Sequence, residues 1–329
     1  MRSTRLPSWI ERLAGLSPQP APPHVFVLDA KELAYGLCRR EQGRFVLATH
    51  EVVQLPPDLF QAGLLGGPAR DETALANAIG ALLGRLPSVP QRASLVLPDA
   101  WLRLAFTESG DLPKEAAARD QVLRWQLKRV VPFRVDELRV RAVEVSPLVE
   151  QEQPKRLLLG FGLEELLAQL EAQFAAAGVR IGQVQSVSLA LLSALADEPA
   201  EDRLIGLALV GEGGYTLLFA RGGEPVLHRY KGAEHELPFE AQQRLVERDL
   251  KLTRTFLDEN LPETPLSRTL VLTDDLVLEE VWGEWLETGL GVPAEALVAS
   301  HLAPLGLATA TSGWRRIAPV LGASRQEVA

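Results

Sequence analysis

The sequence has a single cysteine, Cys38, and no apolar run that approaches the ~18 residues needed to cross a bilayer as a helix. One cysteine cannot form an internal disulfide, so nothing indicates an exported, disulfide-stabilised fold. Glu11 and Arg12 interrupt the early apolar residues, which argues against a signal peptide. We therefore expect a cytoplasmic chain in which Cys38 is a small buried residue.

Several ligand and catalytic patterns are also missing. Five scattered histidines and one cysteine give no metal-ligand spacing, and no Gly-x-x-x-x-Gly-Lys-Ser/Thr run occurs. The net charge of −9 argues against a nucleic-acid partner, because phosphate binding needs clustered Lys and Arg. Four carboxylates near the middle of the chain have no nucleophile beside them, and we expect ordinary surface charges at Asp99, Asp111, Asp120 and Asp136.

What the sequence does contain is a repeated pattern of strands and helices in 329 residues, enough for two lobes with separate cores. A meander of three short strands, a helix and a further strand occurs over 24–98 and again over 189–313. The expected elements lie at 25–29, 33–40, 45–53, 72–85 and 93–97, and then at 204–210, 215–220, 225–230, 239–259, 269–273 and 276–286. This internal duplication is the layout of the actin-like fold.

Between the two copies, residues 99–188 show strand and helix patterns in the order β-α-β-β-α-β. That order predicts a compact inserted subdomain of the split βαβ kind. Its last strand is expected at 179–187, after a helix that Gly178 caps.

The two ends of the sequence have their own patterns. Residues 1–23 combine a capping box at Ser8-x-x-Glu11, a short amphipathic face and a proline-rich linker. Such a helix would lie on a membrane surface or a partner, or dock on the protein itself. Residues 314–329 are expected to be a tail, because Pro319 interrupts the short helical pattern.

Several segments resemble the PilM family of cytoplasmic, actin-like proteins of type IV pilus assembly. The most specific match is a helix that ends at Pro132-Phe133 before an acidic strand start. Residues 96–101, 156–188 and 305–308 resemble the family's entry to the inserted subdomain, its return and its closing helix. Over 24–312 the resemblance implies an α/β, ribonuclease H-like duplicated two-lobe fold with an FtsA/PilM-type insertion. The cytoplasmic part of the secretion protein GspL is related.

Actin-like ATPases hold phosphates with two hairpins, each with an Asp followed by Gly and small hydroxyl residues, and a Gly-rich turn contacts the adenosine. The first hairpin here keeps Asp29, but Lys31 and Glu32 stand where close backbone approach needs small residues. A carboxylate such as Glu32 at ~5 Å from a phosphate charge costs on the order of 3 kcal/mol at an effective dielectric of about 20.

The second hairpin keeps its glycines but has Leu209 where the Asp is expected. It runs Gly211, Glu212, Gly213 and Gly214, which an ordinary β-hairpin turn explains equally well.

Thr273, Asp274 and Asp275 replace the third, glycine-rich motif and are suited to cap the following helix. These changes predict a degenerate cleft with no cofactor and no metal, so that the chain is not an enzyme. ATP with Mg²⁺ is the alternative that Asp29 and the glycines leave open.

The helix expected from Pro113 carries a row formed by Val122, Trp125 and Arg129. This row is either part of a wide buried face or an anchor for a partner. In the PilM family the cytoplasmic tail of a bitopic inner-membrane protein, PilN, docks beside the inserted subdomain. The resemblance therefore implies a partner site near Trp125, Arg129, Pro132 and Phe133.

The hypothesis is a cytoplasmic scaffold, peripheral to the inner membrane, in a type IV pilus or type II secretion assembly complex. It would bind a PilN-like protein, with the assembly ATPase as a further candidate partner and membrane contact peripheral at most. One rival is an active actin-fold ATPase or kinase with divergent motifs. Another is a filament-forming homologue of the FtsA kind, for which the helical pattern at 314–319 is too short.

Overall fold

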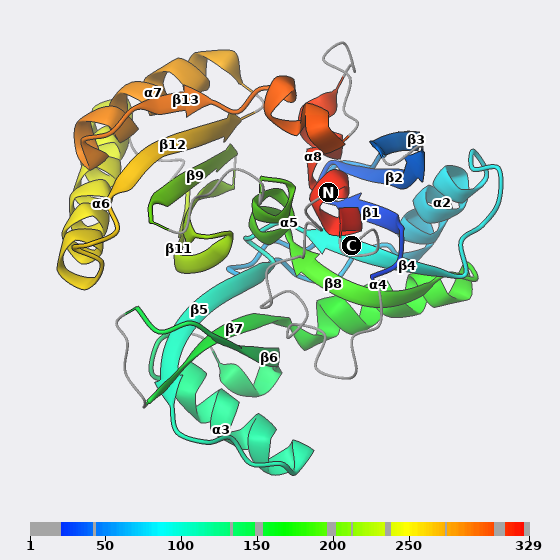
Figure 1. Cartoon of the computed structure of the whole chain (residues 1–329). Coiled ribbons are helices and arrows are strands. Elements are labelled where there is room, and N and C mark those ends of the chain that lie inside the picture. Colours follow the sequence, from blue (N-terminus) through cyan, green and yellow to red (C-terminus); the bar gives the residue numbers. More distant parts are fainter. Residues whose placement is uncertain are drawn as a thin grey trace.

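The computed structural model describes residues 21–41, 44–131, 134–148, 154–195, 202–211, 213–233, 238–273, 275–305 and 313–325. In this part of the chain, two five-stranded sheets and a three-stranded sheet are joined and covered by helices (Figure 1). The strands and helices expected in both copies are present, with ends shifted by a few residues.

The first lobe is built on a sheet with the order β3-β2-β1-β4-β8. Its first three strands form an antiparallel meander, and β4 and β8 continue the sheet in parallel. The strands are β1 (His24–Leu28), β2 (Glu32–Glu41), β3 (Arg44–Gln54), β4 (Arg92–Leu97) and β8 (Arg180–Ser186). Helices α2 (Glu72–Leu83) and α4 (Glu164–Ala176) cover one face, where Phe26, Ile79 and Phe174 are fully buried.

The second lobe repeats this order as β11-β10-β9-β12-β13. The strands are β9 (Leu204–Gly211), β10 (Gly214–Arg221), β11 (Glu224–Gly232), β12 (Leu266–Thr273) and β13 (Ala294–Ala296). Helices α6 (Phe239–Asn260) and α7 (Leu276–Leu290) cover one face, and a 3₁₀ segment, η2 (Ala299–Leu305), follows β13. The duplicated layout expected from the sequence is confirmed by the matching strand order.

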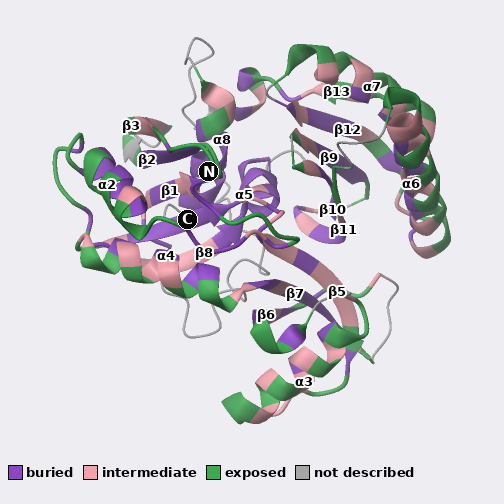
Figure 2. Cartoon of the chain, turned by 180° about the vertical axis from the view of Figure 1, so that it is seen from behind, coloured by how far each residue is buried: buried purple, intermediate pink, exposed green. Residues whose placement is uncertain are grey.

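A shared core joins the two lobes. Helix α5 (Val187–Ala194), which the sequence patterns did not predict, lies with α8 (Trp314–Ser324) between the two large sheets (Figure 1). Residues from both sheets, including Val96 of β4 and Leu218 of β10, pack with these helices in one buried cluster. Burial on this scale makes α5 and α8 part of the interior rather than a surface cover (Figure 2).

The inserted subdomain is smaller than expected. Its sheet has the order β5-β7-β6, formed by β5 (Leu102–Ser109), β6 (Leu138–Val145) and β7 (Lys155–Leu163). Helix α3 (Ala116–Lys128) and the 3₁₀ turn η1 (Val135–Glu137) pack on it. The predicted β-α-β-β-α-β unit over 99–188 is wrong at its end, because β8 pairs with β4 and α4 packs on the first lobe.

The expectation that residues 314–329 form a tail is also wrong for the residues described. Residues 314–324 form α8 despite Pro319, and eight consecutive residues from Ile317 to Ser324 are buried. The helix packs closely on α5 at Gly322, where an added Cβ would lie 1.6 Å from the carbonyl oxygen of Ala190. It also packs on β2, where an added Cβ at Gly36 would lie 2.5 Å from Val320 Cγ1. The capping box at 8–11 lies outside the described residues.

Candidate functional site

The first hairpin, between β1 and β2, uses its acidic side chain to close its own turn. Asp29 Oδ1 accepts hydrogen bonds from the backbone N–H groups of Lys31 at 2.7 Å and Glu32 at 2.8 Å. The Asp29 N–H donates to the carbonyl oxygen of Glu32 at 3.1 Å. These are the bonds of an Asx turn, which Asp forms without any ligand. The hydrogen bonds of Asp29, the one acidic residue kept from the nucleotide motif, therefore stabilise its own turn.

Glu32 follows this turn and is buried, with only 7% of its surface exposed. Its Oε2 accepts a hydrogen bond from Gln54 Nε2 at 3.0 Å and lies 3.0 Å from the Arg316 guanidinium of α8. A buried carboxylate needs such partners, because desolvation of an unpaired charge is costly. The charge of Glu32, which the sequence predicts near a phosphate, is thus paired with Arg316 of the protein itself.

The second hairpin, between β9 and β10, is shaped by its neighbouring strand. Gly214 has φ +135°, and an added Cβ would lie 2.0 Å from the carbonyl oxygen of Lys231 in β11. Only glycine suits that conformation and that approach. The Tyr230 hydroxyl donates to the carbonyl oxygen of Gly213 at 2.7 Å. Packing against β11 therefore accounts for Gly213 and Gly214. Gly211 pairs with Gly214 in the β-ladder. Glu212 lies outside the described residues.

The third segment caps a helix, as one of the two sequence interpretations predicts. Asp275 Oδ1 accepts from the N–H groups of Val277 at 2.9 Å and Leu278 at 3.4 Å. The Asp275 N–H donates to the hydroxyl of Thr273, which is buried, at 3.3 Å. These are the hydrogen bonds of an N-cap at the start of α7. Asp274 lies outside the described residues.

Ion pairs from the first turn of α8 reach the first hairpin and the helix that follows the third segment. Thr273 of β12 is paired with Val210 of β9, so the second and third segments share one edge of the second sheet. Arg315 forms an ion pair with Glu279 of α7 at 2.7 Å, next to the Arg316–Glu32 pair at 3.0 Å. Two adjacent arginines thus join the first hairpin to the second lobe.

On the inserted subdomain, Trp125 and Arg129 of the row on α3 are exposed, whereas Val122 is half-buried. Leu123 and Leu127 form the buried side of α3, whereas Trp125 is 58% exposed and Val130, just after the helix, is 51% exposed. The Arg129 guanidinium lies 5.3 Å from the centre of the Trp125 ring, within cation–π range. Exposed Trp and Arg side chains are typical anchors for a partner. Pro132 and Phe133 lie outside the described residues.

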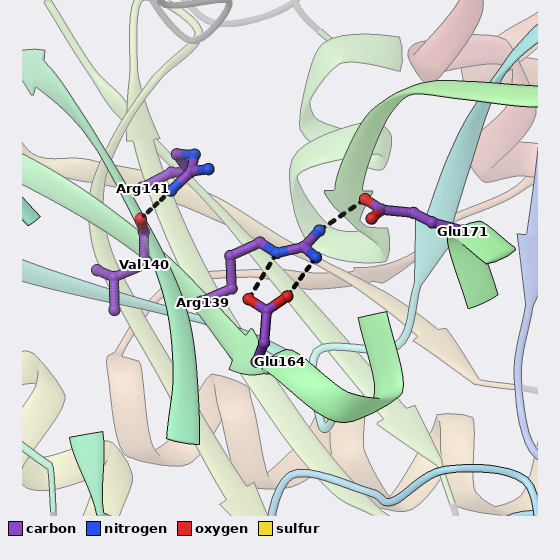
Figure 3. A network of polar contacts seen from close by, with 5 residues as sticks. All are labelled: Arg139, Val140, Arg141, Glu164 and Glu171. Atoms are coloured by element: carbon purple, nitrogen blue, oxygen red, sulfur yellow. Dashed lines mark hydrogen bonds and ion pairs between the residues drawn. The ribbon is translucent and has the colours of Figure 1, made fainter. Parts of the chain in front are cut away.

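The subdomain that carries this row is tied to the first lobe by a forked ion pair (Figure 3). Arg139 of β6 donates to both carboxylate oxygens of Glu164, at 2.9 and 2.6 Å, and to Glu171 at 2.6 Å. The hydrogen bonds from Arg139 lower the pKa of Glu164. Because the two parallel hydrogen bonds fix both the distance and the orientation between Arg139 and Glu164, β6 is held against α4.

The other side of the subdomain is tied to β11 of the second lobe. Arg156 of β7 is buried and donates to the carbonyl oxygen of Val226, and burial lowers the pKa of Arg156 to about 10. The Arg103 guanidinium of β5 lies 4.4 Å from the centre of the Tyr230 ring. The subdomain therefore contacts both lobes, which holds α3 in a defined position.

One buried polar cluster was missed by sequence reasoning. Asp99, expected on the surface, is 5% exposed, and it accepts a hydrogen bond from the Ser188 hydroxyl. His228 Nε2 of β11 lies 3.4 Å from the same Asp99 oxygen and 3.4 Å from Ser188 Oγ. In a catalytic relay the imidazole would lie between the other two groups, and the serine would be accessible. This cluster instead joins the two lobes through buried polar contacts.

Within the residues that the structure describes, no helix is long and apolar enough to cross a membrane. No group of three or more His, Cys, Asp or Glu side chains in the same residues is placed to hold a metal ion.

Comparison with solved structures identifies relatives in fold. A chain of the PilM–PilN type IV pilus biogenesis complex is 17% identical, with a TM-score of 0.69 over 94% of this chain and 100% of that chain. A Bacteroides thetaiotaomicron protein with an actin-like ATPase fold and unknown function is 8% identical, with a TM-score of 0.49 over 83% and 90% of the two chains. The cytoplasmic domain of EpsL, an inner-membrane component of the type II secretion system of Vibrio cholerae, is 12% identical, with a TM-score of 0.41 over 77% and 83%.

No protein-family model and no curated protein matches the sequence. The fold that the resemblance implies is thus confirmed: this chain shares the architecture of a chain of the PilM–PilN type IV pilus biogenesis complex over 94% of its length.

Proposed function

We propose that the chain is a cytoplasmic scaffold of a type IV pilus or type II secretion assembly complex, bound to a bitopic inner-membrane protein and unable to use ATP. The observation that carries this is the structural match to a chain of the PilM–PilN complex, which covers 94% of this chain. The partner in this proposal is a PilN-like protein, which would contact the scaffold through its cytoplasmic tail.

The side chains around the cleft support the absence of ATP turnover. Asp29 is bound within its own turn, and Glu32 is paired with Arg316. Both turn bonds of Asp29 use Oδ1, which leaves only Oδ2 for magnesium, and a phosphate would have to displace Glu32 from its arginine. With Leu209 in place of the second acidic residue, the second hairpin supplies no carboxylate from its described residues.

The exposed part of the row on α3 supports a partner site on the insertion. Trp125 gives a large aromatic surface, and Arg129 gives a charge without an ion pair among the described residues. A tail with apolar and acidic residues would match both features. Because contacts with α4 and β11 hold the subdomain, little ordering entropy would be lost there when the tail binds.

The test is binding of a synthetic peptide with the cytoplasmic tail sequence of the PilN-like protein from the same genome. Arg129→Glu should weaken binding about tenfold or more, which is 1.4 kcal/mol. The matched control is Lys128→Glu, the same charge change about 100° around the helix axis. Both variants should melt near the wild-type temperature, because neither cation forms an ion pair with a described residue. Equal peptide affinity in all three proteins would place the partner site elsewhere.

Calorimetry with Mg²⁺ and ATP tests the other half of the proposal. We expect no saturable heat up to millimolar nucleotide. A dissociation constant in the low micromolar range would favour the rival ATPase or kinase, whatever the peptide experiment shows.

A further inference from the structure

The outer face of α6 is cationic and apolar. Val246, Leu250, Thr253 and Leu257 are its buried residues. Between 244 and 252, helical periodicity turns another set of side chains away from the sheet, and all of them are exposed: Arg244, Leu245, Arg248, Lys251 and Leu252; Thr255 and Glu259 are exposed further along the helix. Leu245 is 41% exposed and Leu252 is 51% exposed. We call this set the basic α6 face.

The outer face of α7 has the opposite charge. Its buried residues are Trp282, Leu286 and Leu290. The exposed residues on the other side are Leu276, Val277, Glu280, Glu284 and Glu287. Leu276 is 62% exposed and Val277 is 72% exposed, both large values for apolar side chains. We call this set the acidic α7 face.

The two helices are neighbours on the same side of the second sheet, and Figure 2 shows exposed residues along both. They touch at Gly289, where an added Cβ would lie 2.6 Å from Leu250 Cβ. Arg254 of α6 also donates to the carbonyl oxygen of Leu290 at 2.8 Å. The basic and acidic faces therefore belong to one outer surface of the second lobe.

The charges on this surface are not paired with charges on other described residues. Arg244, Arg248 and Lys251 form no ion pair with another described residue, and neither do Glu280 and Glu284. An anionic membrane would be attracted to the basic α6 face but repelled by the acidic α7 face beside it, and a uniformly charged protein would meet the same conflict. The surface suits a partner with the same two charges in exchanged positions.

We propose that this surface pairs with the same surface of a second copy of the chain, so that α6 of each copy lies against α7 of the other. A twofold axis brings two different patches together twice, which makes the surface self-complementary. The exposed leucines and Val277 would be covered at the centre, and the charges would pair around them. Because these pairs are exposed, the association should weaken as salt is raised.

The test uses two charge-reversed proteins, R244E/R248E and E280R/E284R, in analytical ultracentrifugation of the full chain. The wild type should form a concentration-dependent dimer, and each variant alone should associate at least about tenfold more weakly, because like charges then face each other twice. An equimolar mixture of the two should regain the dimer, since both contacts again join opposite charges. The matched control R119E/K128E, which reverses two exposed cations on α3, should dimerise like the wild type.

A monomeric wild type would overturn the proposal, and so would unchanged dimers in either variant or a mixture that stays monomeric. Sedimentation with anionic vesicles adds a separate arm. Vesicle binding that R244E/R248E abolishes and E280R/E284R strengthens would assign the basic α6 face to a membrane and would also overturn the proposal. The variants should keep the wild-type melting temperature, which separates lost association from lost folding.

Discussion

The contact between α8 and α5 can be tested with a single methyl group. Replacing glycine by alanine inside a helix normally stabilises it by about 1 kcal/mol, because alanine loses less backbone entropy on folding. At Gly322 the added Cβ would lie 1.6 Å from the carbonyl oxygen of Ala190 and 2.8 Å from the backbone nitrogen of Ala194. Both are backbone atoms of α5, so the overlap is relieved only when α8 moves away.

Overpacking of a tight core typically costs about 1–3 kcal/mol, and a clash with backbone belongs at or above the upper end. After the helix-propensity gain is subtracted, Gly322→Ala should lose about 2 kcal/mol or more. With an unfolding entropy of about 2.1 cal/mol/K per residue, that is a fall in Tm of about 3 °C or more for a chain of 329 residues, measured by circular dichroism.

The control is Gly80→Ala, in the middle of α2, where nothing lies within 4 Å of an added Cβ. That change should raise Tm. If both alanine variants are stabilised alike, α8 is not packed on α5 as described. A second control uses β2: Gly36→Ala meets the side chain of Val320, so adding Val320→Ala should recover part of the loss, and the two changes should not be additive.

Three further predictions concern other parts of the chain. Arg139→Gln should lower Tm at neutral pH but change it less in acid. The pKa of Glu164 is lowered in the folded protein, so the stability from this ion pair is present above the unfolded pKa of about 4.3. That stability is lost as the pH falls through the folded-state pKa. Asp275→Ala should cost about 1 kcal/mol of stability through loss of the N-cap, measured by urea unfolding. Cys38 is buried and its thiol pKa is raised to about 11, so it should react with Ellman's reagent at pH 8 only after denaturation.

The duplicated lobes could be predicted from sequence because their signals are local. Alternating apolar residues, turn residues and helical spacing mark each strand and helix without reference to its neighbours. The inserted subdomain could not be bounded in this way. The strand pattern at 180–186 is the same whether it pairs within the insertion or, as it does, with β4. Strand pairing depends on residues far apart in the chain, and local patterns in a single sequence do not indicate it.

Two local rules were outweighed by packing. Pro319 removes a helical hydrogen bond at a cost of about 3 kcal/mol, yet α8 continues through it because its last eight residues are buried between the lobes. Asp99 looked like a surface charge, and its partners Ser188 and His228 come from distant parts of the chain. The N-cap at Asp275 could be predicted from the sequence, because it depends only on neighbouring residues.

The position of α8 has a consequence for the chain during its synthesis. The first lobe's sheet is complete once β8 has left the ribosome, but the face of β2 around Gly36 is covered by α8, which is made much later. At about 5–20 residues per second, the roughly 140 residues between the end of β8 and the end of α8 take on the order of 7–28 s to synthesise, and this face stays uncovered during that time. During that time the nascent first lobe presents an uncovered apolar face, which is the kind of surface that chaperones bind.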